Sequence, residues 1–252
     1  MTKQQGRAVR TRAALVQAAA AHFDREGYEG TSLSKVCGTA GTSLGALTFH
    51  FPTKGALADA VMAEGRALTQ AALLRISALP GPALRKVVGL TLELTRLLEE
   101  ETAVRCAVRL ARERPGTGGW SDIWRPVVKQ LLDQAHSNGQ LRYGAGPAEV
   151  AMLVEYLTAG AEAFLRGRPD AGAAAGTTVA QLKSVWRLAL AGVCVTAEAG
   201  AAEEAGWPRT DPEEAGAAEE TGWPRTDPVD RPTVQTGHDD DGLSEHWAAS
   251  CS

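Results

Sequence analysis

The sequence predicts an all-α protein that consists of an N-terminal helical domain, a C-terminal helical bundle and an acidic tail. Apolar residues recur at helical spacing through most of the first 197 residues, and no segment alternates as a half-buried strand does. In the tail, segment 201–212 recurs almost unchanged as 217–228, within a stretch too polar to form a core. We therefore expect domains at residues 1–53, 54–199 and 200–252.

The N-terminal domain is expected to contain one longer helix and two short ones. An amphipathic run up to Phe23 is closed by a turn at Gly27, and two short apolar segments follow at 33–40 and 43–49. A tight turn at Gly41 separates these two segments. Two short helices around a glycine-containing turn, behind a longer helix, are the layout of a helix-turn-helix DNA-binding motif.

The ends of the two short helices carry residue types that cap helices. Thr31 or Ser32 is expected to cap the first short helix with a side-chain oxygen, and Ser43 is expected to cap the second. Gly41 stands where the chain turns sharply, a position that often requires a positive φ. We expect the free amides at such helix starts to face DNA phosphates.

The second short helix is expected to enter a DNA groove. Gly45 and Ala46 keep one side of it slim, so that its backbone can approach a groove edge closely. Leu47 falls on the opposite, core-facing side, as do Leu33 and Val36 of the preceding helix. The candidate DNA-binding residues are Thr31, Ser32, Thr42, Ser43, Leu44, Gly45, Ala46, Thr48, Phe49, His50 and Lys54.

Residues 11–57 resemble the DNA-binding domain of the TetR family of one-component repressors. Within that family, the phrase at 45–51 and the turn at 24–29 are similar to those of the γ-butyrolactone autoregulator receptors. The resemblance implies a homodimer that reads a palindromic operator and is released by a small signalling molecule of γ-butyrolactone, furan or butenolide type. The matching residues are Thr11, Ala18, Ala19, Phe23, Gly27, Tyr28, Thr31, Leu33, Ala40, Gly41, Gly45, Leu47, Phe49, His50, Phe51, Lys54 and Leu57.

Two positions depart from the family pattern. A basic residue often stands where this chain has Leu44, and a tyrosine usually stands where it has Thr48. Loss of a lysine removes a contact to guanine or phosphate, and loss of a tyrosine removes a hydrogen bond to phosphate. Leu44 can instead contact a thymine methyl group, so we expect a shifted operator preference or weaker binding.

The charge distribution is compatible with DNA binding although the net charge is −4. Residues 198–252 hold 14 acidic and 3 basic side chains, which leaves a net charge of +7 on residues 1–197. A basic body attracts the phosphate backbone. The N-terminus lacks the apolar core of a signal peptide, and no apolar run approaches membrane-spanning length, so we expect a cytoplasmic protein without membrane contact.

The helical bundle is expected to contain six helices, at 54–79, 83–101, 104–113, 120–137, 147–165 and 178–197. The TetR resemblance implies that the last two pair with their copies across a two-fold axis. Each carries an apolar line that an intramolecular core would also explain in part. These lines are Val150, Val154, Leu157, Ala161 and Phe164, and Leu182, Val185, Leu188, Ala189 and Val193.

Trp124 is the expected ligand contact, because it resembles the tryptophan that butyrolactone receptors place in their pocket. An indole offers a flat apolar wall and one donor, which suits an alkyl chain beside a lactone. A core tryptophan without ligand is the alternative. Gln130, Tyr143 and Thr158 are candidate polar contacts for a carbonyl or hydroxyl group, although Gln130 could equally be a surface residue.

The sequence leaves other functions open. The chain could sense an antibiotic or a biosynthetic intermediate, or act through a protein partner. We expect no enzyme, cofactor or metal, because the sequence has no phosphate-binding glycine loop, metal-ligand spacing or nucleophile elbow. The composition of the tail predicts disorder; alternatively, Trp207 and Trp223 anchor a docking motif, and acidic residues 239–241 bind a cation.

Overall fold

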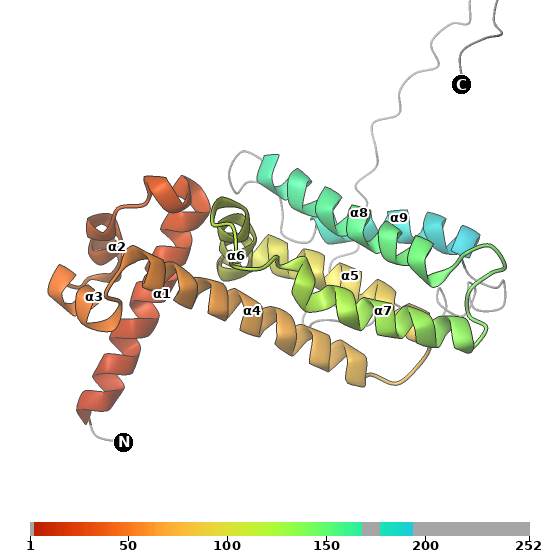
Figure 1. Cartoon of the computed structure of the whole chain (residues 1–252), viewed down its shortest axis with the longest axis horizontal. Helices are drawn as coiled ribbons and strands as arrows, with labels where there is room; N and C mark the ends of the chain where they lie inside the picture. The colour runs from red at the N-terminus through yellow and green to blue at the C-terminus, as the bar shows by residue number, and fades with distance from the viewer. Residues whose placement is uncertain (1–2, 168–176, 194–252) are drawn as a thin grey trace, which may run out of the picture. The chain divides into compact units, whose positions relative to one another are not determined.

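Helices account for the fold of the computed structural model over the residues that it describes, 3–167 and 177–193 (Figure 1). The N-terminal motif comprises α1 (Lys3–Gly30), α2 (Leu33–Ala40) and α3 (Leu44–His50). No strand occurs in these two ranges, so the predicted fold class is confirmed. The remaining helices are α4 (Lys54–Ala78), α5 (Ala83–Glu100), α6 (Thr102–Glu113), α7 (Ser121–Ser137), α8 (Pro147–Gly167) and α9 (Thr177–Val193).

The helices of the bundle begin and end within a few residues of their predicted limits. Proline and glycine explain several ends, since Pro82 directly precedes α5 and Gly139, with φ 68°, follows the end of α7. Predicted helix residues 194–197 and the tail at 200–252 lie outside the described residues.

The first helix differs from the expected one in length and is bent where a turn was predicted. α1 already begins at Lys3, and Gly27 interrupts it with φ 76° and ψ 177°. A Cβ atom at Gly27 would also lie 2.7 Å from Nη2 of Arg109, on α6. The backbone angle therefore requires glycine here, and a side chain would also have to displace the end of Arg109.

The N-terminal core is formed by α1, α2 and α3 together with parts of α4 and α6. Leu47 and Val36 are fully buried, as predicted, and Leu33 packs against the same core with partial exposure. The core also takes in residues of α4 and α6 that lie beyond the predicted domain limit at 53: Leu57, Ala58, Val61, Met62, Cys106, Ala107 and Leu110.

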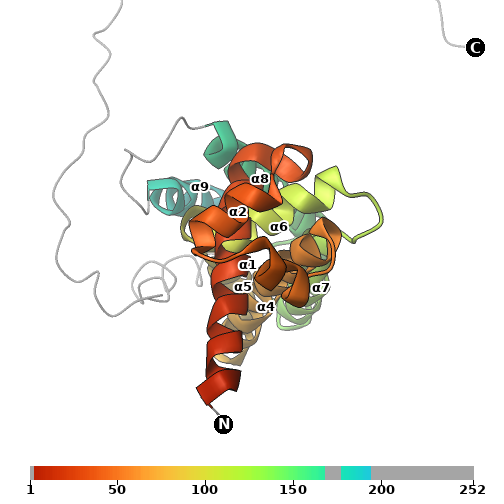
Figure 2. The same cartoon turned by 90° about the vertical axis from the view of Figure 1, so that its left-hand side faces the viewer.

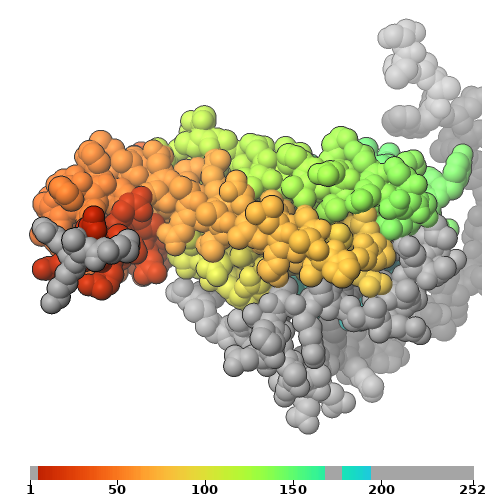
Figure 3. Space-filling model, turned by 90° about the horizontal axis from the view of Figure 1, so that it is seen from below, coloured from red at the N-terminus to blue at the C-terminus, as the bar shows by residue number. Residues whose placement is uncertain are grey.

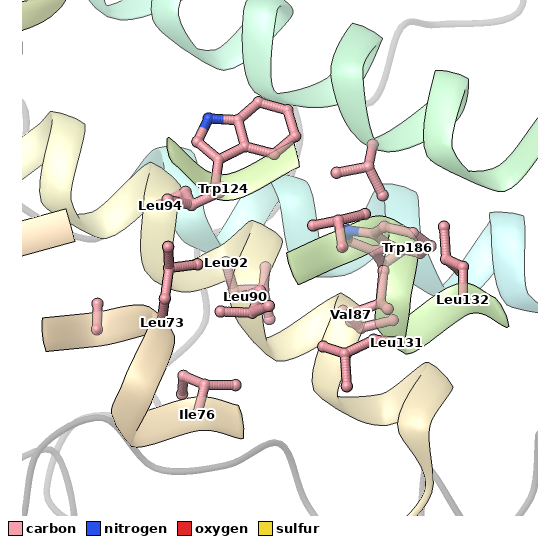
Figure 4. Packing of buried hydrophobic residues seen from close by; sticks show 14 of the residues in the cluster. Leu73, Ile76, Val87, Leu90, Leu92, Leu94, Trp124, Leu131, Leu132 and Trp186 are labelled. Carbon is pink, nitrogen blue, oxygen red and sulfur yellow. The ribbon is translucent and has the colours of Figure 1, made fainter. Parts of the chain in front are cut away.

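The bundle core surrounds α5, which is buried on most of its surface. Figure 4 shows residues of α4, α5, α7 and α9 that meet in this core, with Trp124 near Leu94 and Trp186 near Leu132. α4 contributes Ala72, Leu73 and Ile76. The far end of α4 thus belongs to the bundle, whereas its first turns belong to the N-terminal core.

Figure 3 shows α4 at the surface along one side of the molecule, with α7 next to it. In its middle, α4 packs closely on α6: a Cβ atom at Gly65 would lie 2.5 Å from the carbonyl oxygen of Ala103. α4 therefore joins the two cores as one continuous helix that α6 holds in place. None of the described helices is long and apolar enough to span a membrane.

Candidate nucleic-acid interface and ligand core

The start of α3 is fixed by the cap that its sequence predicts. The Ser43 Oγ accepts a hydrogen bond from the Ala46 amide at 3.2 Å. Gly41, with φ 63°, ends α2 in the left-handed region and allows the tight turn. Together with buried Leu47, these contacts set the position of α3 on the N-terminal core.

The predicted side-chain cap of α2 is wrong for both candidates. Thr31 is 3% exposed, and its hydroxyl donates to the Gly27 carbonyl at 2.7 Å. Ser32 occupies the cap position but its side chain makes no capping hydrogen bond. The bend at Gly27 leaves a carbonyl that attracts the Thr31 hydroxyl, so Thr31 stabilises the end of α1 and does not present its hydroxyl to solvent.

The outer face of α3 combines large apolar side chains with a glycine. Leu44 is 50% exposed and Phe49 is 83% exposed. The Thr48 hydroxyl donates to the Gly45 carbonyl at 3.1 Å. A Cβ atom at Gly45 would meet only Ser43 Oγ, at 3.9 Å, so the surface beside Gly45 is open.

Lys54 and His50, the candidate phosphate contacts beside α3, both make contacts within the chain. Lys54 donates to the Glu29 carbonyl at 3.2 Å and lies 4.8 Å from the centroid of the Tyr28 ring, which holds it against the end of α1. The His50 ring lies between those of Phe49 and Phe51.

Arginines on α1 are candidates that the sequence reasoning missed. The Arg12 guanidinium lies 5.1 Å from the centroid of the Phe51 ring, directly after α3. Arg7 and Arg10, nearer the start of α1, are exposed. Figure 2 shows α1 running down to the N-terminus. The run of arginines at positions 7, 10 and 12 of the sequence was the signal that could have identified them.

An arginine–glutamate cluster on α6 holds the end of α1. We call Arg105, Arg109 and Glu113 the α6 cluster. Arg105 Nε donates to the Asp24 carboxylate at 3.0 Å, and Arg109 Nη1 donates to the Asp24 carbonyl at 2.6 Å. The Glu113 Oε2 accepts from the Tyr28 amide at 2.6 Å. The α6 cluster therefore fixes the backbone that surrounds the bend in α1.

The Glu113 pKa reflects two opposed effects. Partial burial raises the pKa of this carboxyl group, whereas hydrogen bonds from Arg109 and from the Tyr28 amide lower it. The combined effect of the hydrogen bonds is larger, so the pKa of Glu113 lies below its ordinary value.

Trp124 lies in the interior of the bundle, 2% exposed, with its ring 6.1 Å from that of Trp120 in an edge-to-face arrangement. The two indoles differ in hydrogen bonding. Trp120 Nε1 donates to the Thr69 hydroxyl at 2.9 Å, whereas the buried Trp124 Nε1 has no acceptor among the described residues. Trp186 on α9 is fully buried and its Nε1 likewise has no acceptor there. Sequence reasoning did not single out Trp186.

Of the predicted polar ligand contacts, only Thr158 lies in the interior. It is 2% exposed and donates to the Val154 carbonyl at 2.8 Å, which leaves its oxygen able to accept a hydrogen bond. Gln130 is exposed and Tyr143 is fully exposed, so neither lies in the interior with Trp124. Gln130 follows Trp124 by six residues, which places it about 120° away around α7.

A buried carboxylate, Glu93 on α5, was also missed. It is 1% exposed and forms ion pairs with Arg75 of α4 and Arg96 of its own helix. Its hydrogen bonds with Arg96 raise the pKa of that guanidinium. The end of α4 is thus tied to α5 by a charge pair as well as by apolar packing.

The apolar lines predicted on α8 and α9 divide between the core and the surface. Val150, Val154, Ala161 and Leu182 are buried inside the bundle. Other apolar residues of the same two helices are exposed in the single chain: Met152 (50%), Tyr156 (70%), Phe164 (48%), Val185 (43%) and Leu188 (78%).

Comparisons with known proteins agree with this arrangement. The family model of "Bacterial regulatory proteins, tetR family" matches residues 15–61. A solved structure of TylP, a TetR regulator from Streptomyces fradiae, is 30% identical, with a TM-score of 0.50 over 77% of this chain and 84% of that one. The chain belongs to the TetR family.

Two further proteins similar to this TetR-family chain are described as receptors. A structure of a γ-butyrolactone receptor (ArpA-like protein) is 26% identical, with a TM-score of 0.63 over 77% of this chain and 93% of that one. The A-factor receptor protein of Streptomyces griseus is 29% identical over 154 residues, or 60% of this chain. The match spans only 53%, about half, of that receptor's length. The protein is a TetR-family DNA-binding regulator similar to γ-butyrolactone receptors.

Proposed function

We propose that the protein is a homodimeric repressor that occupies a palindromic operator through α3 and is released by a small amphiphilic molecule. The exposed outer face of α3, beside the arginines of α1, supports operator binding. One helix-turn-helix reads few base pairs, and two copies one DNA turn apart read a palindrome. Residues 1–53 and 54–199 are proposed as DNA-binding and as ligand-binding and dimerisation domains.

The exposed apolar residues of α8 and α9 support the dimer. An apolar patch of this kind on a single chain marks a contact with another molecule. Met152 and Tyr156 lie on α8, and Leu188, which is 78% exposed, lies on α9. A two-fold axis across these helices would cover both sets at once, because the same patch then faces itself.

Trp124 carries the ligand proposal. Its buried N–H has no acceptor among the described residues, and such a group costs about 1–3 kcal/mol unless an acceptor reaches it. A lactone carbonyl or a furan carboxylate supplies an acceptor beside an alkyl chain that suits the apolar core. The proposed ligand is a γ-butyrolactone, furan or butenolide, with Trp124 as donor and Thr158 as a second contact.

Release follows from the connection between the two cores. α4 packs in the bundle at Leu73 and Ile76 and in the N-terminal core at Leu57 and Val61. A ligand that binds more tightly to one setting of α4 changes the separation of the two α3 helices, and a palindrome accepts only one separation.

An antibiotic or biosynthetic intermediate is the second candidate for the ligand, since it could offer the same acceptor and apolar surface.

A gel-shift assay tests the proposal directly. The purified full-length protein should retard its own upstream promoter fragment at low salt, with an affinity that falls steeply as salt rises. A synthetic γ-butyrolactone, a furan and a butenolide should each be titrated against the complex. No retarded band with any nearby promoter contradicts the repressor role; retardation without release by any of these ligands contradicts the ligand class alone.

A further inference from the structure

The reading helix α3 presents apolar side chains where a DNA-binding helix usually presents donors. Leu44, its first residue, is 50% exposed, and Phe49 is 83% exposed. Large apolar side chains that gather on one exposed element mark the surface that contacts another molecule. In the proposed function this molecule is DNA, and the chemical groups by which α3 recognises the bases are still to be assigned.

The hydroxyl groups of Ser43 and Thr48 take part in hydrogen bonds within the chain, and the His50 ring packs between those of Phe49 and Phe51. The Ser43 Oγ accepts from the Ala46 amide, and the Thr48 hydroxyl donates to the Gly45 carbonyl. No lysine or arginine lies between residues 44 and 50. Because guanine is read mainly by bidentate arginine or lysine, α3 lacks the side chains for that contact.

The shape of α3 leaves room for a group of methyl size. Gly45 precedes Phe49 by four residues, so the two lie on the same face of the helix. A Cβ atom at Gly45 would meet only Ser43 Oγ, at 3.9 Å, so the space next to Phe49 is unfilled. Leu47 is fully buried on the opposite side, which directs this face outward.

Thymine is the base that presents a methyl group in the major groove, at C5. We propose that α3 reads its operator by hydrophobic contact of Leu44 and Phe49 with thymine methyl groups, and not by hydrogen bonds to guanine. This inference rests on the proposed function and adds the chemical group that is recognised. The phosphate contacts come from neighbouring elements, including Arg12 at the edge of α3.

The test uses a duplex that the full-length protein selects from a random-sequence DNA library. Each thymine of that duplex is then replaced by uracil, which removes only the C5 methyl. Burial of one such group is worth about fourfold in Kd, so a symmetric pair of replacements in the two half-sites should weaken binding about 15-fold. An unchanged Kd on the uracil duplex, or selected half-sites without thymine, overturns the inference. If no duplex is selected, the proposed function itself fails.

Variants identify the side chain. Leu44→Ala should abolish the thymine–uracil difference at one symmetric position, and Phe49→Ala at another, while the slope of log Kd against log salt stays unchanged. Leu74→Ala is the matched control, because Leu74 is 74% exposed on α4, outside α3, and this variant should keep the full difference. The ratio of the Kd on the uracil duplex to the Kd on the thymine duplex is measured with one preparation of each variant, so partial loss of folded protein does not affect this ratio. If both α3 variants retain the ratio of the wild type, the proposal is wrong.

Discussion

Two regions of the molecule differ in whether their polar groups have hydrogen-bond partners: the junction between α1 and α6, and the interior of the bundle. At the junction, the α6 cluster makes charge-assisted hydrogen bonds to Asp24 and to the Tyr28 amide. In the bundle, Trp124 and Trp186 bury indole N–H groups that have no acceptor among the described residues. The neighbouring indoles of Trp120 and Trp124 differ in the same way, because Trp120 Nε1 donates to the Thr69 hydroxyl.

This difference in hydrogen bonding suggests a structural role for the junction and a binding role for the bundle interior. A satisfied polar network fixes one arrangement, whereas a buried donor without an acceptor costs about 1–3 kcal/mol. We therefore propose that the junction transmits position to α3, and that a ligand gains affinity in the bundle interior by pairing with the Trp124 N–H.

The largest expected effect comes from forcing α4 away from α6, the helix that forms the junction with α1. Gly65→Ala should lower the free energy of unfolding by about 2 kcal/mol, because the new Cβ would lie 2.5 Å from the Ala103 carbonyl oxygen and the backbone of α6 must shift. Gly38→Ala is the matched control: a Cβ at Gly38 has nothing within 4 Å, and stability should rise slightly. Urea unfolding of both variants measures the difference, and equal midpoints would contradict it.

Replacing each neighbouring tryptophan by phenylalanine separates the paired donor from the unpaired one. Trp120→Phe should cost about 1 kcal/mol more than Trp124→Phe, because only Trp120 loses a hydrogen bond. Thermal melts of the two variants give the comparison.

In the ligand titration, Trp124→Phe should have a larger effect than Trp120→Phe. Trp124→Phe should raise the ligand concentration for half-release of the operator about fivefold, since one hydrogen bond to the ligand is lost. This variant is preferable to Trp124→Ala, because Trp124 is 2% exposed and truncation would open a cavity. Release at the concentration of the wild type would show that the indole does not bind ligand.

Acid should weaken the junction through Glu113. Because the folded-state pKa of Glu113 is lowered, its contribution to stability is complete above the unfolded-state pKa of about 4.3; it is lost as the pH falls through the lower folded-state value. Its side chain is 33% exposed and that of Arg109 is 32% exposed, so we expect a loss of only about 1 kcal/mol.

Melting temperatures between pH 7 and pH 3 measure the effect of acid on Glu113. Glu113→Gln should melt earlier than the wild type at neutral pH and show a flatter dependence on pH. Parallel curves for the two proteins would mean that Glu113 does not carry the acid sensitivity.

The smallest effect on the folded protein is expected at Gly45. Gly45→Ala should leave the free energy of unfolding within about 0.5 kcal/mol of the wild type or raise it, because α3 gains a better helix former. Its added Cβ meets only Ser43 Oγ, at 3.9 Å. Operator affinity should nevertheless fall about tenfold, since the methyl group keeps α3 from the groove. A gel shift with unchanged affinity would place Gly45 away from DNA.

The N-terminal motif could be predicted from the sequence because local chemistry determines it. The turn at Gly41, the cap at Ser43 and the burial of Leu47 depend on residues a few positions apart, and the structure confirms all three. Helix limits in the bundle follow from proline, glycine and apolar periodicity in the same way. The TetR resemblance then placed Trp124, and the structure puts it in the interior.

Contacts between distant segments were decided only by the tertiary structure. Thr31 is capable of capping α2, but the bend at Gly27 offers its hydroxyl a carbonyl instead. The α6 cluster joins residues more than 80 positions apart, for which no local pattern exists. Gln130 and Tyr143 have suitable chemistry but face solvent, because side-chain type does not specify direction. Local interactions are encoded by spacing along the chain, whereas the pairing of polar groups depends on which elements the packed cores bring together.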